Sequence, residues 1–321
     1  MRARVIVASL AVALAAGCGS SSTPPPSVTV APVDAMPAKA EEVTTAPVAG
    51  NADCDREASL RPGPQPRPGA MPPGSTMAKI AERGRLIVGV DQNSYLLGFR
   101  NPSSGRLEGF DIDVAREIAR SIFGDPDRID LRAVEASQRV AALQSGEVDL
   151  VVRTYSITCD RKKEVAFSTT YFNASQRILA LKGSGIDSPG ALSGKRVCAV
   201  KGTTSLSALF ALDPRPTLFG VSNWTDCLVM LQQGQVDAIS TDDAVLAGLA
   251  KQDPNVEVIG PSLGLEPYGV GIKKENKDLV RFVNGALDEM RADGTWQRIY
   301  DAWLRGGLGP SPGPPTPRYE D

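Results

Sequence analysis

A motif that occurs twice sets the strongest limit on the fold of this chain. It reads ALQSGEVDLVV at 142–152 and MLQQGQVDAIS at 230–240, with Leu-Gln-x-Gly-x-Val-Asp in common. In each copy an apolar helix end meets a glycine suited to a helix cap, and a buried strand follows. Such joints look alike in any α/β protein, but the identities shared here favour a duplication. We therefore expect two similar α/β lobes.

Polar residues follow both strands of the repeat. They are Arg-Thr-Tyr-Ser at 153–156 and Thr-Asp-Asp at 241–243. In open α/β sheets, ligands bind beyond the carboxyl ends of the strands. Two lobes that each present such an edge predict a ligand cleft between them.

The flanking sequence fits the same architecture. GRLIVGV (84–90) predicts a short buried strand, and a helix is expected after the glycine turn in SSGRLEGFDID (103–113). Two C-terminal helices carry apolar and aromatic residues at helical spacing, which is typical of a core rather than a cofactor site. The residues expected to form these core faces are Ile112, Ala115, Ile118, Ala119, Ile122, Leu279, Phe282, Val283, Ala286, Leu287, Met290, Trp296, Ile299, Tyr300 and Trp303.

The N-terminus resembles a lipoprotein signal peptide over residues 1–17. Arg2 and Arg4 precede the apolar stretch VIVASLAVALAA, which is too short to span a bilayer as a helix. LAAGC then ends at Cys18, as in a lipobox, although the usual bulky residue three places before the cysteine is an alanine. We expect lipidation (palmitate) at Cys18 and export to the outer face of the cell membrane.

Proline-rich segments flank the folded region. Residues 18–77 contain few large apolar side chains and predict a solvated, disordered tether, and the tail 307–321 has a similar character. The globular part then covers about 78–306. Lys and Arg number 35 against 37 Asp and Glu, with no basic stripe, which argues against nucleic-acid binding.

The chain has no histidine and five cysteines. The absence of histidine excludes Ser-His-Asp and Cys-His catalysis and His-ligated metals. A nucleophile at Cys159 would lack its usual base. Besides Cys18, the even number of cysteines in an exported chain favours disulfides, and the spacing fits no zinc motif.

Several stretches, in this order, resemble the solute-binding proteins of ABC importers for polar amino acids. They are GFDIDVAREIA, ALQSGEVDLVV, SITCDRKKEVAFS, LSGKRVCAVKGTTS, VDAISTDD and PYGVGI. The similarity covers about residues 84–305 and is greatest to the actinobacterial glutamine/glutamate-binding lipoproteins (the GlnH-like group). It implies a type II periplasmic-binding-protein fold, with two Rossmann-like lobes joined by hinge strands. Lobe 1 would hold 78–180 plus 270–306, lobe 2 would hold 181–269, and the hinges would be 177–182 and 267–272.

The resemblance also implies how the two charges of an amino acid are bound. Arg161 matches the family arginine for the α-carboxylate, and Asp242 matches the aspartate for the α-ammonium. Asp243 is the competing candidate, since one of these two adjacent aspartates is expected to cap the helix that follows. We expect polar contacts to the ligand from four further residues, Thr154, Ser156, Thr203 and Thr204. Thr203 and Thr204 could alternatively form an ordinary helix N-cap.

The side chain of the ligand would meet residues that differ from those of glutamine binders. Arg153 and Arg177 stand where the family often has small residues, and Thr241 where it can have histidine. Extra arginine favours glutamate or aspartate over glutamine or asparagine, unless either arginine pairs with a protein carboxylate such as Asp91. Tyr95 lies in the loop that usually packs an aromatic ring on the ligand.

For the cysteines, the resemblance and proximity within a lobe imply a Cys198–Cys227 disulfide. Cys54 would then pair with Cys159, one of three possible connectivities.

The expected function is that of a monomeric binding protein without cofactor or catalytic residue. It would capture a polar L-amino acid by closing its lobes and deliver it to the permease of an ABC importer. Two alternatives remain open: a sensor subunit for a signalling membrane protein, and a dehydratase-type enzyme on the same fold.

Overall fold

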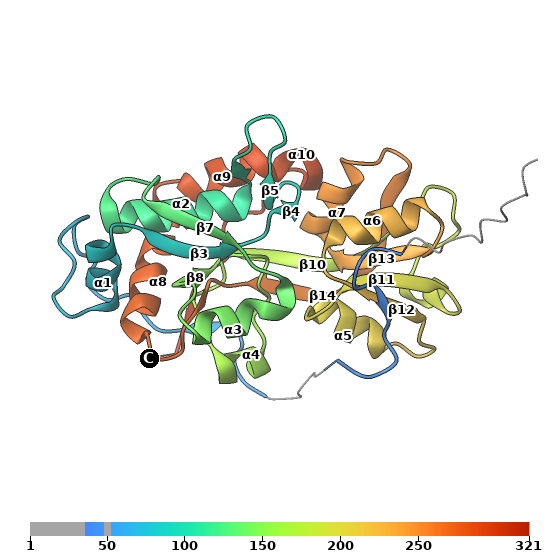
Figure 1. The fold of residues 1–321 in the computed structure, drawn as a ribbon, viewed down its shortest axis with the longest axis horizontal. Coiled ribbons are helices and arrows are strands. Elements are labelled where there is room, and N and C mark those ends of the chain that lie inside the picture. The colour runs from blue at the N-terminus through green and yellow to red at the C-terminus, as the bar shows by residue number, and fades with distance from the viewer. Residues whose placement is uncertain (1–35, 48–52, 321) are drawn as a thin grey trace, which may run out of the picture. The chain divides into compact units, whose positions relative to one another are not determined.

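The computed structural model describes residues 36–47 and 53–320, so the expected signal peptide and Cys18 lie outside the described residues. Within them, a five-stranded sheet contains three parallel strands and two short strands at one side (Figure 1). Its order is β7 (Ile129–Ala133), β3 (Leu86–Val90), β8 (Leu150–Val151), β15 (Gly271–Ile272) and β9 (Ala166–Phe167). A three-stranded ribbon follows β3 and consists of β4 (Asn93–Ser94), β5 (Gly98–Arg100) and β6 (Leu107–Glu108).

The second sheet has six strands. Its central strand β11 pairs in parallel with β12 on one side and with β13 on the other, whereas β1, β10 and β14 pair antiparallel with their neighbours. The order is β1 (Glu41–Glu42), β12 (Thr217–Val221), β11 (Arg196–Val200), β13 (Ala238–Asp242), β10 (Phe172–Leu181) and β14 (Val256–Tyr268).

Helices pack beside each sheet. Those of the first are α1 (Thr76–Arg83), α2 (Phe110–Phe123), α3 (Arg139–Gln144), α4 (Cys159–Glu164), α8 (Lys277–Ala292), α9 (Thr295–Trp303) and α10 (Arg305–Leu308), with the 3₁₀ turn Ala136–Gln138. Those of the second are α5 (Thr204–Phe210), α6 (Trp224–Gln232) and α7 (Asp243–Ala250), with the 3₁₀ turn Pro189–Leu192. Within the part of the chain described, no helix has the length and apolar character needed to cross a membrane.

Helix α2 illustrates how local sequence sets an element. Its expected apolar face is buried against the sheet and against α8 and α9. Gly109 precedes the helix with a φ of 134°, and a Cβ there would lie 2.2 Å from the carbonyl oxygen of Leu97. Gly124 ends the helix in the left-handed conformation. The predicted faces of α8 and α9 are likewise buried, apart from the half-buried Trp303.

After β3, the chain crosses between the two sheets at two places. Strand β9 belongs to the first sheet, and β10 pairs from Phe172 onward with β14 of the second. The first crossing therefore lies at 168–171, earlier than the predicted hinge at 177–182, because residues 177–180 already pair with β13. The return crossing at 269–270 falls within the predicted hinge 267–272. The residue limits of the lobes stay a prediction.

The proline-rich ends differ from the solvated segments expected from composition. Strand β1 adds to the edge of β12, and β2 (Ala58–Ser59) pairs in parallel with β16 (Arg318–Tyr319). Ala58 and Ser59 are both buried. These contacts are mainly backbone hydrogen bonds, which any extended sequence can make at an open strand edge.

Both disulfides implied by the resemblance are present. Cys198–Cys227 joins β11 to α6, with 5.5 Å between the Cα atoms. Cys54–Cys159 joins the N-terminal segment to the first residue of α4, with a Cα–Cα distance of 5.8 Å.

Candidate functional site

A small polar cavity lies where the strands of both repeat copies end. Eight of the eleven residues proposed from the sequence line it, and three do not. The lining residues are Arg139, Arg153, Thr154, Ser156, Arg161, Thr203, Thr204, Ser205, Trp224, Thr241, Asp242 and Val245. The residues that follow β8 form the first lip, and the last residues of β13, Thr241 and Asp242, form the second lip.

Arg161 reaches the cavity from α4. Its Nη1 donates to the carbonyl oxygen of Ser156 at 2.6 Å, and its Nη2 donates to that of Gly202 at 3.0 Å. The guanidinium lies 4.9 Å from the ring centre of Tyr155. Burial lowers the pKa of Arg161, but an arginine remains a cation in proteins.

Arg139 is a cavity residue that sequence reasoning missed. It is 2% exposed, and its guanidinium lies 4.1 Å from the ring centre of Tyr155. Its Nη2 donates to Gly202 O at 3.0 Å, beside the bond from Arg161. Burial, and then the neighbouring charge of Arg161, lower the pKa of Arg139. Neither arginine has a carboxylate within ion-pair distance in residues 36–47 and 53–320.

Arg153, unlike these two, is already neutralised. Its Nη2 lies 3.1 Å from Oδ2 of Asp91, and both side chains are almost fully buried. Asp91 also accepts from the backbone N–H of Gln92 and from the hydroxyl of Ser94. The alternative in which a protein carboxylate pairs with this arginine is therefore the one present, and Arg153 does not indicate an acidic ligand.

Asp242 lies opposite the arginines at the end of β13. The hydroxyl of Tyr268 donates to its Oδ2, while its buried Oδ1 has no hydrogen-bond partner among the residues described. Burial raises the pKa of Asp242, and the nearby carboxylate of Glu266 raises it further. An open, buried carboxylate oxygen is costly unless a cation binds it. The competing candidate Asp243 instead accepts from the backbone N–H groups of Ser175 and Ala244.

Hydroxyl groups complete the cavity. Thr203 caps α5 by accepting from Leu206 N, so the N-cap interpretation of this residue is correct. The hydroxyl of Thr204 donates to Glu266 Oε2 at 2.8 Å and contacts Ser156. Thr241 and Ser205 share a hydroxyl hydrogen bond of 3.0 Å.

Thr154 has a left-handed backbone with a φ of 40°, which is uncommon outside glycine. Its N–H donates to Oδ2 of Asp111 at 2.8 Å, and the hydroxyl of Tyr171 donates to Oδ1 of the same carboxylate. Burial raises the pKa of Asp111 to about 7, against these two hydrogen bonds, which lower it. The carboxylate of Asp111 therefore fixes the backbone of the first lip at Thr154.

Three proposed site residues do not line the cavity. Successive side chains of a strand point to opposite faces, so Gln176 bonds Ser240 on one face while Arg177 lines a separate groove with Asp243. The ring of Tyr95 packs edge-on against Phe99. Asp91 is held by Arg153. Arg177, Tyr95 and Asp91 therefore lie outside the cavity lining.

Chemically, the cavity sets two guanidinium groups, neither of them within ion-pair distance of a carboxylate of the described residues, against a carboxylate with an open oxygen. These charges complement those of a small zwitterion with extra negative charge, but the cavity as described, about 10 Å³, has room for only about one water molecule, so its two lips must separate to admit a ligand. Among the described residues, no group of three acidic or cysteine side chains is placed to bind a metal ion.

The chain is similar to named amino-acid-binding proteins. ABC transporter glutamine-binding protein GlnH of Bacillus subtilis is 39% identical over 231 residues, which are 72% of this chain and 85% of that protein. Glutamate-binding protein GluB of Corynebacterium glutamicum is 33% identical over 238 residues, 70% of this chain and 80% of that protein.

A solved structure of an ancestral arginine-binding protein bound to glutamine is 36% identical. It covers 69% of this chain and 98% of its own, with a TM-score of 0.65. The expected type II fold of two Rossmann-like lobes is thereby confirmed. The family described as "Bacterial extracellular solute-binding proteins, family 3" matches residues 86–306 of this chain. The chain therefore belongs to the family 3 extracellular solute-binding proteins.

Proposed function

We propose that the protein binds an L-amino acid with an acidic side chain, glutamate or aspartate, and delivers it to the permease of an ABC importer. Arg161 binds the α-carboxylate and Asp242 binds the α-ammonium. Arg139 then faces the carboxylate of the side chain. The named relatives bind glutamine or glutamate, which supports a polar amino acid as ligand.

One observation carries the choice of an acidic ligand. Arg139 and Arg161 lie side by side without a carboxylate partner in the described part of the chain. A glutamine ligand supplies one carboxylate and would leave the second buried guanidinium, that of Arg139, with backbone carbonyl acceptors but no opposite charge, which is costly. Glutamate and aspartate supply two.

Calorimetric titration with glutamate, aspartate, glutamine and asparagine tests this proposal. We expect a Kd for glutamate well below about 100 µM and at least about tenfold tighter binding than for glutamine. Arg139→Met keeps an apolar stem over Tyr155 and should bring the two affinities close together. Binding of none of the four below about 100 µM would refute the ligand class. A preference unaltered in Arg139→Met would refute the role of Arg139.

We further propose export as a monomer, with a lipid on Cys18 that anchors the protein to the outer face of the membrane. The family is extracellular by description, which supports export. Labelling cells with radioactive palmitate should mark the wild type and leave the Cys18→Ser variant unlabelled. Equal labelling of both would exclude the anchor at this residue, and light scattering of the purified protein checks the monomer.

A further inference from the structure

Helix α4, which carries Arg161, has little of its own to hold it in place. It comprises six residues, and none of them is buried. A helix this short is not stable in isolation, and without a buried face it gains little from hydrophobic packing. Its position therefore depends on the buried residues Ile157 and Val165 that flank it and on individual polar and covalent contacts.

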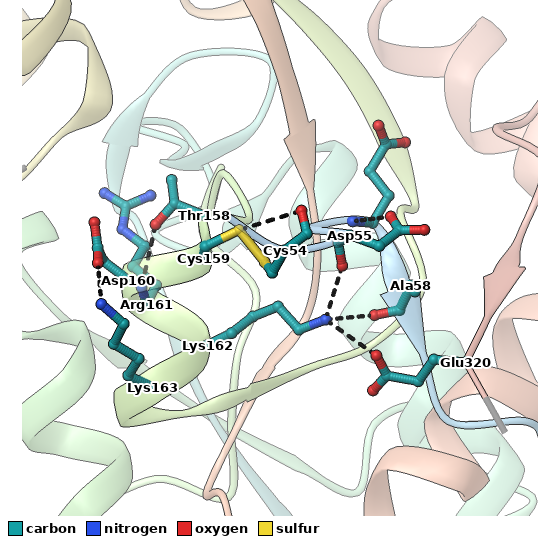
Figure 2. Close-up of a disulfide and its surroundings, with 11 residues drawn as sticks. Cys54, Asp55, Ala58, Thr158, Cys159, Asp160, Arg161, Lys162, Lys163 and Glu320 are labelled. Carbon is teal, nitrogen blue, oxygen red and sulfur yellow. Dashed lines mark hydrogen bonds and ion pairs between the residues drawn. A yellow bond between two sulfur atoms is a disulfide. The ribbon is translucent and has the colours of Figure 1, made fainter. Parts of the chain in front are cut away.

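The N-terminal segment supplies two of these contacts. Cys54 forms a disulfide with Cys159, the first residue of α4. The ammonium of Lys162 donates to the carbonyl oxygen of Asp55 at 3.1 Å and to that of Ala58 at 2.8 Å (Figure 2). The helix is thus joined to the N-terminal segment at both its first and its fourth residue.

The C-terminal tail contacts the same lysine and the same N-terminal segment. Glu320 lies 3.5 Å from the ammonium of Lys162. The parallel pairing of β2 with β16 holds the tail beside the N-terminal segment, and Arg318 forms an ion pair of 2.6 Å with Asp55. We call residues 54–59 and 318–320 the terminal clasp.

Arg161 and Lys162 extend from α4 in different directions (Figure 2). Its guanidinium makes the contacts with Ser156 and Gly202 described above. Helix α4 therefore lies between the terminal clasp and the cavity, with one charged side chain toward each.

We propose that the terminal clasp positions Arg161 for the ligand carboxylate, so that Cys54, Cys159 and Lys162 are positioning residues for binding. This inference rests on the proposed role of Arg161. A bidentate guanidinium–carboxylate contact tolerates little misalignment, and ordering a loose helix on binding would reduce affinity. Release of the clasp should weaken binding while leaving the apolar cores of both sheets intact.

The main test compares two double variants by calorimetry with glutamate and the other three amino acids. Cys54→Ser with Cys159→Ser releases α4, and we expect its Kd to rise about tenfold. Cys198→Ser with Cys227→Ser removes the other disulfide and should leave Kd within about twofold of wild type, even where Tm falls. Circular dichroism at the titration temperature establishes that both are folded.

A matched pair of single variants gives a second, independent test. Lys162→Met removes the ammonium that contacts the clasp, and we expect Kd to rise about threefold. Lys163→Met makes the same change one residue later, where the ammonium bonds Asp160 of the same helix, and should leave Kd unchanged. This pair decides the matter if either disulfide variant does not fold.

The outcomes separate this inference from the proposed function. Failure of the wild type to bind any of the four amino acids would refute the proposed function. A wild type that binds, together with an unaltered Kd in the folded Cys54/Cys159 variant or in Lys162→Met, would refute the clasp alone. Equal weakening by the two disulfide variants, or by the two lysine variants, would also refute it, because general destabilisation would then explain the loss.

Discussion

The two copies of the repeat form the same joint but lead to lips of opposite charge. In the first copy Asp149 exchanges bonds with the neighbouring strand, its Oδ2 accepting from Ile87 N at 2.8 Å. In the second, Asp237 Oδ2 accepts from Arg196 N at the same distance. Each aspartate also pairs with an arginine, Arg83 in the first copy and Arg196 in the second.

Beyond these joints the copies diverge. The first lip carries Arg153 and lies beside Arg139 and Arg161, whereas the second lip ends at Asp242. Beside each lip a buried carboxylate accepts a hydrogen bond from a tyrosine hydroxyl, Asp111 from Tyr171 at the first lip and Asp242 from Tyr268 at the second. The carboxylate of Asp111 uses both oxygens within the protein, while Asp242 keeps one open. A common α/β unit thus provides the scaffold twice, and the charges at the cavity come from Arg139 of α3 and Arg161 of α4 beside the first lip and from Asp242 in the second.

The largest effect is expected on the cationic side. Arg161→Ala should weaken glutamate binding at least about 100-fold, roughly 3 kcal/mol, because the ligand carboxylate loses a buried charge-assisted partner. Calorimetric titration measures the change, with Lys163→Ala as a control on the exposed side of the same helix. An Arg161→Ala variant that retains wild-type affinity would remove Arg161 from the carboxylate role.

A somewhat smaller loss is expected on the anionic side. Asp242→Asn should raise Kd about 30-fold, near 2 kcal/mol, because an amide cannot neutralise the ligand ammonium. The adjacent Asp243→Asn is the matched control, since that carboxylate contacts backbone N–H groups, and it should leave Kd within about twofold. Similar losses in both variants would argue against a specific role of Asp242.

The buried carboxylate of Asp111, which accepts from the backbone N–H of Thr154 in the first lip, should make the free energy of unfolding depend on pH. The pKa of Asp111 is raised by burial to about 7, so its contribution is complete below the unfolded pKa of about 3.9 and is lost as pH rises through about 7. Between these values the free energy of unfolding should fall by up to about 1.4 kcal/mol per pH unit. Urea unfolding of ligand-free wild type and Asp111→Asn at pH 5, 6 and 7 isolates this contribution. Parallel pH profiles would assign the dependence to other groups.

The smallest effects are expected where the two copies agree. Asp149→Ala and Asp237→Ala each remove an acceptor from a strand N–H and should cost about 1 kcal/mol in the free energy of unfolding. The Asp149 change should cost more, because its side chain is 15% exposed against 32% for Asp237. Both should bind glutamate normally. A selective loss of binding in either variant would show that the joints are not equivalent.

Much of the scaffold could be predicted from the sequence. The repeat, β3 and the apolar face of α2 are set by local periodicity and glycine position, which need no knowledge of distant contacts. The motif after β8 likewise placed Arg161 in the cavity. Eight of the proposed site residues lie together because the carboxyl ends of strands from both sheets, with the helices that follow them, meet at the cavity.

Other features depend on partners that are distant in the chain. Arg139 carries no local signal, and only the fold brings it beside Arg161. Arg153 pairs with Asp91, and the alternation of side chains along β10 decides that the side chain of Gln176, rather than that of Arg177, bonds the Ser240 hydroxyl.

The proline-rich ends mark the clearest boundary between the two kinds of information. Composition correctly shows that they cannot form a core of their own, and it therefore predicts a solvated tether and tail. Main-chain pairing of β2 with β16, the Cys54–Cys159 disulfide and the contacts of Lys162 nevertheless place both ends against α4. Backbone hydrogen bonds and a covalent crosslink do not require apolar side chains, so no composition or periodicity reveals where such a segment docks.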